Sequence, residues 1–118
     1  MGVLGGNMKG VYVAGALNDM AVGYIKNVHR MIVCAERVRR AGFGVFVPCL
    51  DLLMGIMLGD YVYDDYFYNS QVWLEKADAV FVCPGWKDSK GTIREIKYAT
   101  ELGIPVYFDI EILKEDLG

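Results

Sequence analysis

A glutamate beside a turn suited to phosphate binding is the most chemically suggestive feature of this sequence. Residues 79–83 form an unbroken apolar run, AVFVC, which is typical of a strand buried on both faces. A glycine-containing loop follows, and then a helix that begins at Ser89, Gly91 or Thr92. A strand, a loop and a helix in this order direct backbone N–H groups and the positive helix end toward one point, which suits an anion. Glu95 lies one turn into that helix, so we predict an acid that works beside a bound anionic group.

The other apolar stretches predict the elements that hold this site. Strands are expected at residues 11–14, 43–47, 79–83 and 104–108, and helices at residues 22–41, 65–77, 89–103 and 109–117. This alternation indicates an α/β fold, with a flavodoxin- or Rossmann-like, doubly wound parallel sheet. Four to five strands are expected in the order 2-1-3-4, with any fifth strand beyond strand 4. The carboxyl ends of strands 1 and 3 then flank one crevice, where ligands bind in such sheets.

Two of the predicted helices carry a face that is expected to pack on the sheet. In residues 22–41 this face consists of Ile25, Val28, Ile32, Ala35 and Val38. In residues 65–77 it consists of Tyr66, Ser70, Trp73 and Ala77. Residues 52–58 are expected to form a short apolar helix, and His29 is expected at the surface.

The composition predicts one compact domain. The chain has 118 residues, enough for one core, and its hydrophobic content of 54% is too high for a disordered chain. No apolar run approaches the ~18 residues of a membrane helix, so no membrane partner is expected. Residues 1–8 are expected to be a leader or a remnant of cloning without fixed structure, and residues 9–118 to form the domain.

Charge and cysteine content exclude several kinds of partner. The net charge is −3, and Arg37, Arg39 and Arg40 fit a solvated helix end, so no nucleic-acid partner is expected. The three cysteines are widely spaced and match no metal-binding or redox pattern. We therefore expect reduced thiols in a cytoplasmic protein, with neither a metal nor another cofactor.

Four residues and a short motif resemble the nucleoside 2-deoxyribosyltransferase superfamily. They are Tyr12, Ser89, Gly91 and Glu95, and the motif EIxxA that begins at Glu95. The similarity spans about residues 11–108 and is greatest to small phage and bacterial members that carry PGWxxSxGxxxE. The superfamily also includes 2′-deoxynucleoside 5′-monophosphate N-glycosidases. The resemblance implies that Glu95 is the nucleophile that attacks C1′ of a deoxyribosyl unit, and that Tyr12 hydrogen-bonds to Glu95 and positions it.

The resemblance also implies where the substrate lies. The residues expected to bind it are Gly15, Asn18, Ser70, Trp86, Ser89 and Gly91. Ser89 replaces an aspartate that contacts the sugar in the transferases, and its hydroxyl can donate to a 5′-phosphate that a carboxylate would repel. Ser70 replaces an aspartate that helps to protonate the leaving base in both enzyme groups. Because a hydroxyl is a poor general acid, Asp64 or Asp65 would have to take over this role.

Several of these residues also have structural explanations that need no chemistry. Thr92 and Glu95 match a capping box, in which the glutamate accepts a hydrogen bond from a backbone N–H. Ser89 fits a helix N-cap, and Tyr12 fits the core of the sheet. Trp86 can stack on a nucleobase or simply cover the core.

The tyrosine-rich residues 61–68 are too apolar to be left exposed. They can pack in the core, cover a bound base as a lid, or contact another subunit. Superfamily members complete their sites with a neighbouring subunit, so the resemblance implies a homodimer or a larger homo-oligomer.

Three functions fit these observations. The first is cleavage or base exchange at the N-glycosidic bond of a (deoxy)nucleoside or its 5′-monophosphate, which makes a small nucleoside or nucleotide the partner. The second is a nucleotide-binding or sensing module without turnover, because Ser70 replaces the acid. The third is a phosphoribohydrolase of the lysine-decarboxylase-like family, whose PGGxGTxxE motif resembles residues 84–95. That motif needs adjacent glycines where this chain has Trp86 and an insertion.

Overall fold

The structure is a computed structural model that describes residues 8–16, 21–48, 57–60 and 62–118. Residues 1–7 of the leader expected at residues 1–8, most of the short helix expected at residues 52–58, and Asn18 lie outside the described residues.

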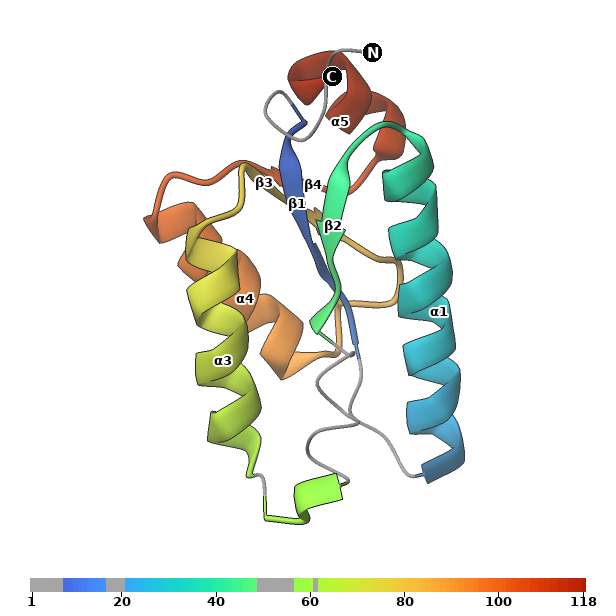
Figure 1. Ribbon diagram of the computed structural model, residues 1–118, viewed down its shortest axis with the longest axis vertical. Helices are drawn as coiled ribbons and strands as arrows, with labels where there is room; N and C mark the ends of the chain where they lie inside the picture. The colour runs from blue at the N-terminus through green and yellow to red at the C-terminus, as the bar shows by residue number, and fades with distance from the viewer. Residues whose placement is uncertain (1–7, 17–20, 49–56, 61) are drawn as a thin grey trace.

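A four-stranded parallel sheet forms the centre of the fold, in the order β2-β1-β3-β4 (Figure 1). Its strands are β1 (Gly10–Ala14), β2 (Gly44–Phe46), β3 (Ala79–Val82) and β4 (Val106–Tyr107). The predicted α/β class, parallel pairing and strand order are confirmed. The two edge strands, β2 and β4, are shorter than the apolar runs that predicted them, because only a few of their residues pair with a neighbour. Short edge strands also leave little backbone open to pairing with other chains.

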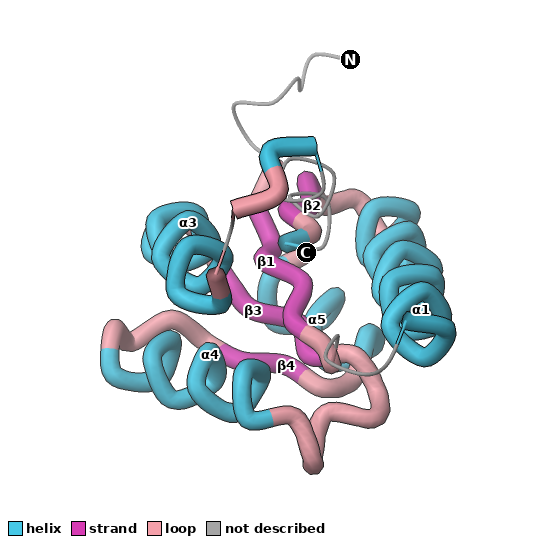
Figure 2. Tube along the Cα trace, turned by 90° about the horizontal axis from the view of Figure 1, so that it is seen from below, coloured by secondary structure: helices cyan, strands magenta, loops and turns pink. Residues whose placement is uncertain are grey.

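Helices cover both faces of the sheet. α1 (Ala21–Arg40) and α5 (Ile110–Leu117) pack on one face, and α3 (Tyr63–Glu75) and α4 (Lys90–Glu101) pack on the other. Figure 2 looks from the end where the strands finish and shows α1 on one side of the sheet, with α3 and α4 opposite. Among the described residues, no helix is both long and apolar enough to cross a membrane.

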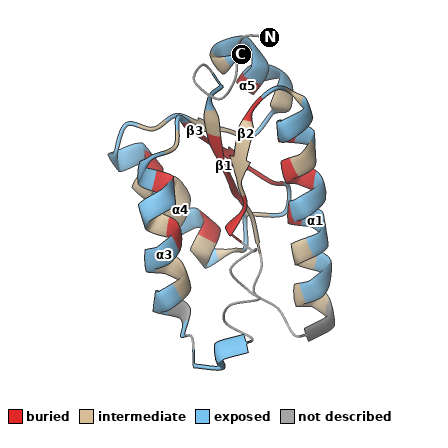
Figure 3. Cartoon of the chain, in the orientation of Figure 1, coloured by how far each residue is buried: buried red, intermediate tan, exposed pale blue. Residues whose placement is uncertain are grey.

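The two central strands, β1 and β3, lie in the middle of the core, and nearly all of their residues are buried (Figure 3). Their side chains alternate between the two faces, as a strand requires. Val11, Val13 and Phe81 pack with α1, whereas Tyr12 and Val80 pack with α3 and α4. Burial on both faces explains why these strands are apolar at every position.

The face that α1 turns to the sheet matches the prediction in part, because Val28, Ala35 and Val38 pack in the core as expected. Met31 and Cys34 are buried there, whereas Ile25 is 67% exposed and Ile32 is 44% exposed. Apolar residues occupy more than one side of α1, so the apolar pattern alone did not identify the side that contacts the sheet. His29 is exposed, as predicted.

The buried face of α3 also matches the prediction in part, because Ser70 lies on it as expected. Ser70 and Leu74 are buried, while Trp73 is 49% exposed. Trp73 nevertheless keeps a contact with the sheet, because its ring stacks on Phe46 of β2.

Candidate functional site

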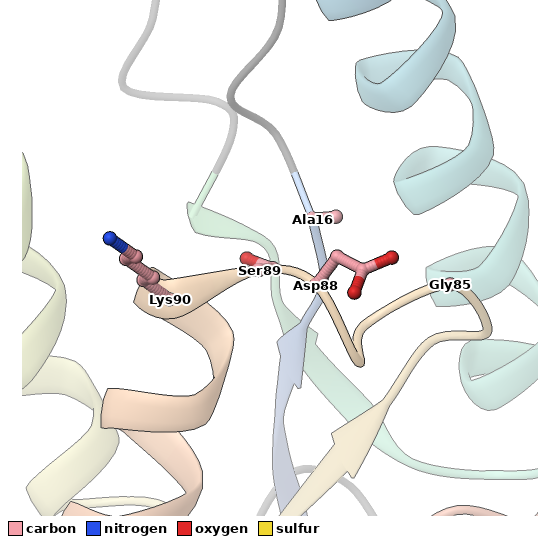
Figure 4. A pocket seen from close by; sticks show the side chains of 5 residues that line it. All are labelled: Ala16, Gly85, Asp88, Ser89 and Lys90. Carbon is pink, nitrogen blue, oxygen red and sulfur yellow. The ribbon is translucent and has the colours of Figure 1, made fainter.

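A hollow of about 300 Å³ opens where β1 and β3 end. It is lined by Ala16, which follows β1, and by Gly85, Asp88, Ser89 and Lys90, which connect β3 to α4 (Figure 4). This is the predicted crevice, since β1 and β3 flank the point at which the strand order reverses.

Ser89 forms the N-cap of α4 and also lines the hollow. Its Oγ accepts a hydrogen bond from the N–H of Thr92 at 3.2 Å and lies 2.9 Å from Thr92 Oγ1. The two explanations offered for Ser89, a cap and a ligand-facing residue, are therefore compatible. Because α4 begins right after Ser89, Thr92 is not an N-cap, and the proposed capping box between Thr92 and Glu95 is wrong. Gly91 lies in the first turn of α4 and is half-buried.

Glu95 is held by a tyrosine from the centre of the sheet. The hydroxyl of Tyr12 donates to Glu95 Oε2. Tyr12 is 0% exposed and belongs to the core between β1, α3 and α4, so it is a core residue with a polar contact at its tip. Glu95 itself is half-buried. The contact that the family resemblance implied between these two side chains is thus present.

Glu95 is not among the residues that line the hollow. It lies about 9 Å beyond Ser89 along the axis of α4, since a helix rises ~1.5 Å per residue. The hollow therefore lies at the N-terminal end of α4, and the carboxylate of Glu95 lies farther along the same helix.

Gly15 occupies a close approach between the end of β1 and its neighbours. A Cβ at this position would lie 3.1 Å from Met31 Cε and 3.2 Å from Cys83 Cβ. A larger residue here would therefore require Met31 and Cys83 to shift by a few tenths of an ångström. Cys83 and Cys34 are buried free thiols behind it, and a hydrogen bond with Cys83 lowers the pKa of Cys34.

Trp86 is placed away from the hollow. It is half-buried against the core under α3 and α4, and its ring centroid lies 5.2 Å from that of Phe108. This placement matches the explanation that Trp86 covers the core. It does not place the ring on the lining of the hollow.

The groups considered for protonating a leaving base lie on α3. Ser70 is buried, with 6% of its surface exposed. Asp64 and Asp65 are exposed in the first turn of α3, and Asp65 Oδ2 accepts a hydrogen bond from the N–H of Val62 at 2.8 Å. None of the three lines the hollow.

Asp88 is a lining residue that the sequence did not single out. Figure 4 shows its carboxylate and the amine of Lys90 on opposite sides of Ser89. The hollow therefore carries both signs of charge, and Asp88 opposes an anion while Lys90 attracts one. Its position next to Ser89 was the signal that could have identified it. Within the described part of the chain, no group of three or more side chains could hold a metal ion.

We compared the sequence and the structure of this chain with those of known proteins. No curated protein matches the sequence. Among solved structures, the chain is similar to the 2-deoxyribosyltransferase from the psychrotolerant bacterium Bacillus psychrosaccharolyticus, with a TM-score of 0.61 and 27% sequence identity. The match covers 82% of this chain and 69% of that chain, and it confirms the resemblance to 2-deoxyribosyltransferases. Residues 9–108 match the family described as "Domain of unknown function (DUF4406)", and the chain therefore belongs to this family.

Proposed function

We propose that the protein cleaves the N-glycosidic bond of a (deoxy)nucleoside or its 5′-monophosphate, by hydrolysis or base exchange, with Glu95 as nucleophile. The observation that carries this proposal is the hydrogen bond from the buried Tyr12 to Glu95. It restrains a half-buried carboxylate, and a restrained carboxylate can both attack C1′ and balance the positive charge that develops there. The similarity to a solved 2-deoxyribosyltransferase supports the same reaction class.

The proposed reaction has two displacements at C1′. First, an oxygen of Glu95 forms a bond to C1′ while the bond from C1′ to the base nitrogen breaks. The base leaves with that electron pair and takes up a proton. Water or a second base then attacks C1′ and releases the carboxylate, so the configuration at C1′ is retained overall.

The leaving base needs a proton donor, and α3 offers candidates. The hydroxyl of Ser70 is a poor general acid. Asp65 accepts a hydrogen bond from Val62 and helps to begin α3. We therefore favour Asp64, which is exposed in the same turn.

Ser70, which stands where related enzymes carry an aspartate, also supports a second function. If no acid replaces the aspartate that Ser70 stands for, the protein would bind a nucleotide without cleaving it. This module and the enzyme share the hollow and the Tyr12–Glu95 contact. They differ only in whether base is released.

The hollow is our candidate for the 5′-phosphate site. Ser89 and Lys90, at the start of α4, line it, and the N-terminal end of a helix favours negative charge. The carboxylate of Asp88 weakens this preference. Asp88 would therefore reduce, but not remove, the preference for a monophosphate over a nucleoside.

A second copy of the chain is the proposed protein partner. α3 leaves three large apolar side chains about half exposed, Tyr68, Val72 and Trp73, and its N-cap residue Val62 is exposed as well. Tyr68 belongs to the segment expected to contact another subunit. A homodimer that covers this face would remove these side chains from water. We also propose a cytoplasmic location, where the buried thiols would remain reduced.

The experiment that tests the proposed function compares substrates and variants together. Wild type and Glu95→Gln are incubated with a panel of (deoxy)nucleosides and their 5′-monophosphates, and released base is separated by chromatography. Release by the wild type that is lost in the variant supports the enzyme. Binding of a nucleotide with no release of base by the wild type supports the silent module.

A further inference from the structure

Three aromatic rings link the hydrogen-bond partner of Glu95 to the protein surface. Tyr12 of β1 lies opposite Phe46 of β2 in the sheet register, and their ring centroids are 5.6 Å apart with 25° between the planes. Phe46 stacks in turn on Trp73 of α3, at 5.4 Å and 19°. We name Tyr12, Phe46 and Trp73 the aromatic stack.

Burial changes along the aromatic stack from complete to partial. Tyr12 is 0% exposed, Phe46 is half-buried and Trp73 is 49% exposed. At the buried end, the hydroxyl of Tyr12 donates to Glu95. The stack therefore runs from a carboxylate in the candidate site to the surface of α3.

We propose that Phe46 and Trp73 are positioning residues, which hold the ring of Tyr12 and thereby fix the carboxylate of Glu95. The hydroxyl is the part of Tyr12 farthest from the backbone, so a small tilt of the ring moves it more than any other atom. Offset stacking restricts such a tilt, because aromatic pairs favour defined centroid separations and plane angles. The kinetic consequence of this inference depends on the proposed function, but the contact chain itself does not.

A matched set of surface variants measures the kinetic consequence. Trp73→Leu removes a half-exposed ring and so leaves no closed cavity, whereas Trp73→Phe keeps an aromatic ring. Ile112→Ala changes an apolar side chain of α5 that is 50% exposed and lies outside both the aromatic stack and the proposed dimer face, and it serves as the control. Misplacement of a reacting group by ~1 Å can lower a rate about 10²-fold, so we expect Trp73→Leu to lower kcat about tenfold with KM within about twofold.

A normal kcat in Trp73→Phe would distinguish a positioning role of the ring from an effect on stability. Trp73→Phe and Ile112→Ala are expected to keep kcat within about twofold of wild type. A purely structural role predicts that Trp73→Leu lowers the melting temperature and leaves kcat of the folded protein unchanged. That result would overturn the proposal.

A spectroscopic test needs no turnover. The chain has 2 tryptophans, so Trp86→Phe leaves Trp73 as the single reporter. In this background we expect Glu95→Gln and Tyr12→Phe to change the near-ultraviolet circular dichroism of Trp73. Glu101→Gln, an exposed glutamate on the same helix, is expected to leave the spectrum unchanged.

The spectroscopic test of the aromatic stack and the kinetic test of the proposed function can fail independently. An unchanged Trp73 spectrum in Glu95→Gln would refute the link between the surface ring and the carboxylate, even in an active enzyme. A changed spectrum in a protein that releases no base from any substrate would support the aromatic stack and remove only the proposed function.

Discussion

Two neighbouring substitutions change the charge of the hollow in opposite directions, and so test whether it takes a 5′-phosphate. Ser89→Asp adds a carboxylate at the N-cap of α4, and Asp88→Asn removes one from the preceding residue. Both side chains line the hollow. Aspartate also serves well as an N-cap, so Ser89→Asp is expected to preserve the start of α4.

The hydrogen bonds of Ser89 set the size of the expected effect. A hydroxyl can accept two hydrogen bonds and donate one. If Ser89 Oγ accepts from both the N–H and the hydroxyl of Thr92, its own proton is left to donate to a phosphate. One such charge-assisted hydrogen bond is worth roughly 1.5–3 kcal/mol, which corresponds to about a tenfold to hundredfold preference for monophosphate over nucleoside.

The effect of Asp88 is expected to be smaller. Its side chain is exposed, and two unit charges ~4 Å apart in water repel by only ~1 kcal/mol. Asp88→Asn should therefore strengthen monophosphate binding by at most about fivefold, and less at high salt. Nucleoside binding should change little.

Calorimetric titration in a Glu95→Gln background, which prevents turnover, gives the required affinities. A deoxynucleoside and its 5′-monophosphate are titrated into the parent, Ser89→Asp and Asp88→Asn proteins. We expect the parent to prefer the monophosphate, Ser89→Asp to lose that preference, and Asp88→Asn to increase it. Equal binding of both ligands by the parent, unchanged in both variants, would show that Ser89 is only a helix cap.

Three further predictions concern stability and assembly. Gly15→Ala should destabilise the fold by ~1–3 kcal/mol in urea titration, because the new Cβ would lie 3.1 Å from Met31 Cε; an unchanged midpoint would contradict this. Asp109→Ala should cost ~1 kcal/mol in the same assay, because Asp109 accepts the N–H of Glu111 at 2.8 Å; equal stability would show that the cap adds nothing. Sedimentation at micromolar concentration should find a dimer that Tyr68→Asp weakens, and a wild-type monomer would exclude the proposed interface.

Much of the fold was predictable because its signals are local. Residues 79–83 are apolar at every position because β3 is covered on both faces. Gly42 and Gly103, which end α1 and α4, have positive φ values of 105° and 76° that favour glycine. The exposure of Ile25 and Ile32 was not predictable, because the apolar residues of α1 do not form a single stripe.

The candidate site was predicted less completely, because its contacts join distant parts of the chain. Tyr12 and Glu95 were paired through a family resemblance, since nothing in their local sequence brings them together. The stacking of Phe46 on Trp73 depends on how α3 lies against an edge strand, which a helical pattern does not specify. Asp88 belongs to no recognisable motif, and only its position next to Ser89 in the sequence could have indicated that it lines the hollow.

The most direct test of the central claim is a search for a sugar bonded to Glu95. The protein is mixed with a substrate from the panel, quenched with acid and digested, and the peptide that contains Glu95 is examined by mass spectrometry. Glu95→Gln is the test variant, and Glu101→Gln, on the exposed end of the same helix, is the matched control. We predict a deoxyribosyl or deoxyribosyl-phosphate adduct on Glu95 in the wild type and in Glu101→Gln, and neither adduct nor base release in Glu95→Gln. Base release that survives in Glu95→Gln would contradict the account.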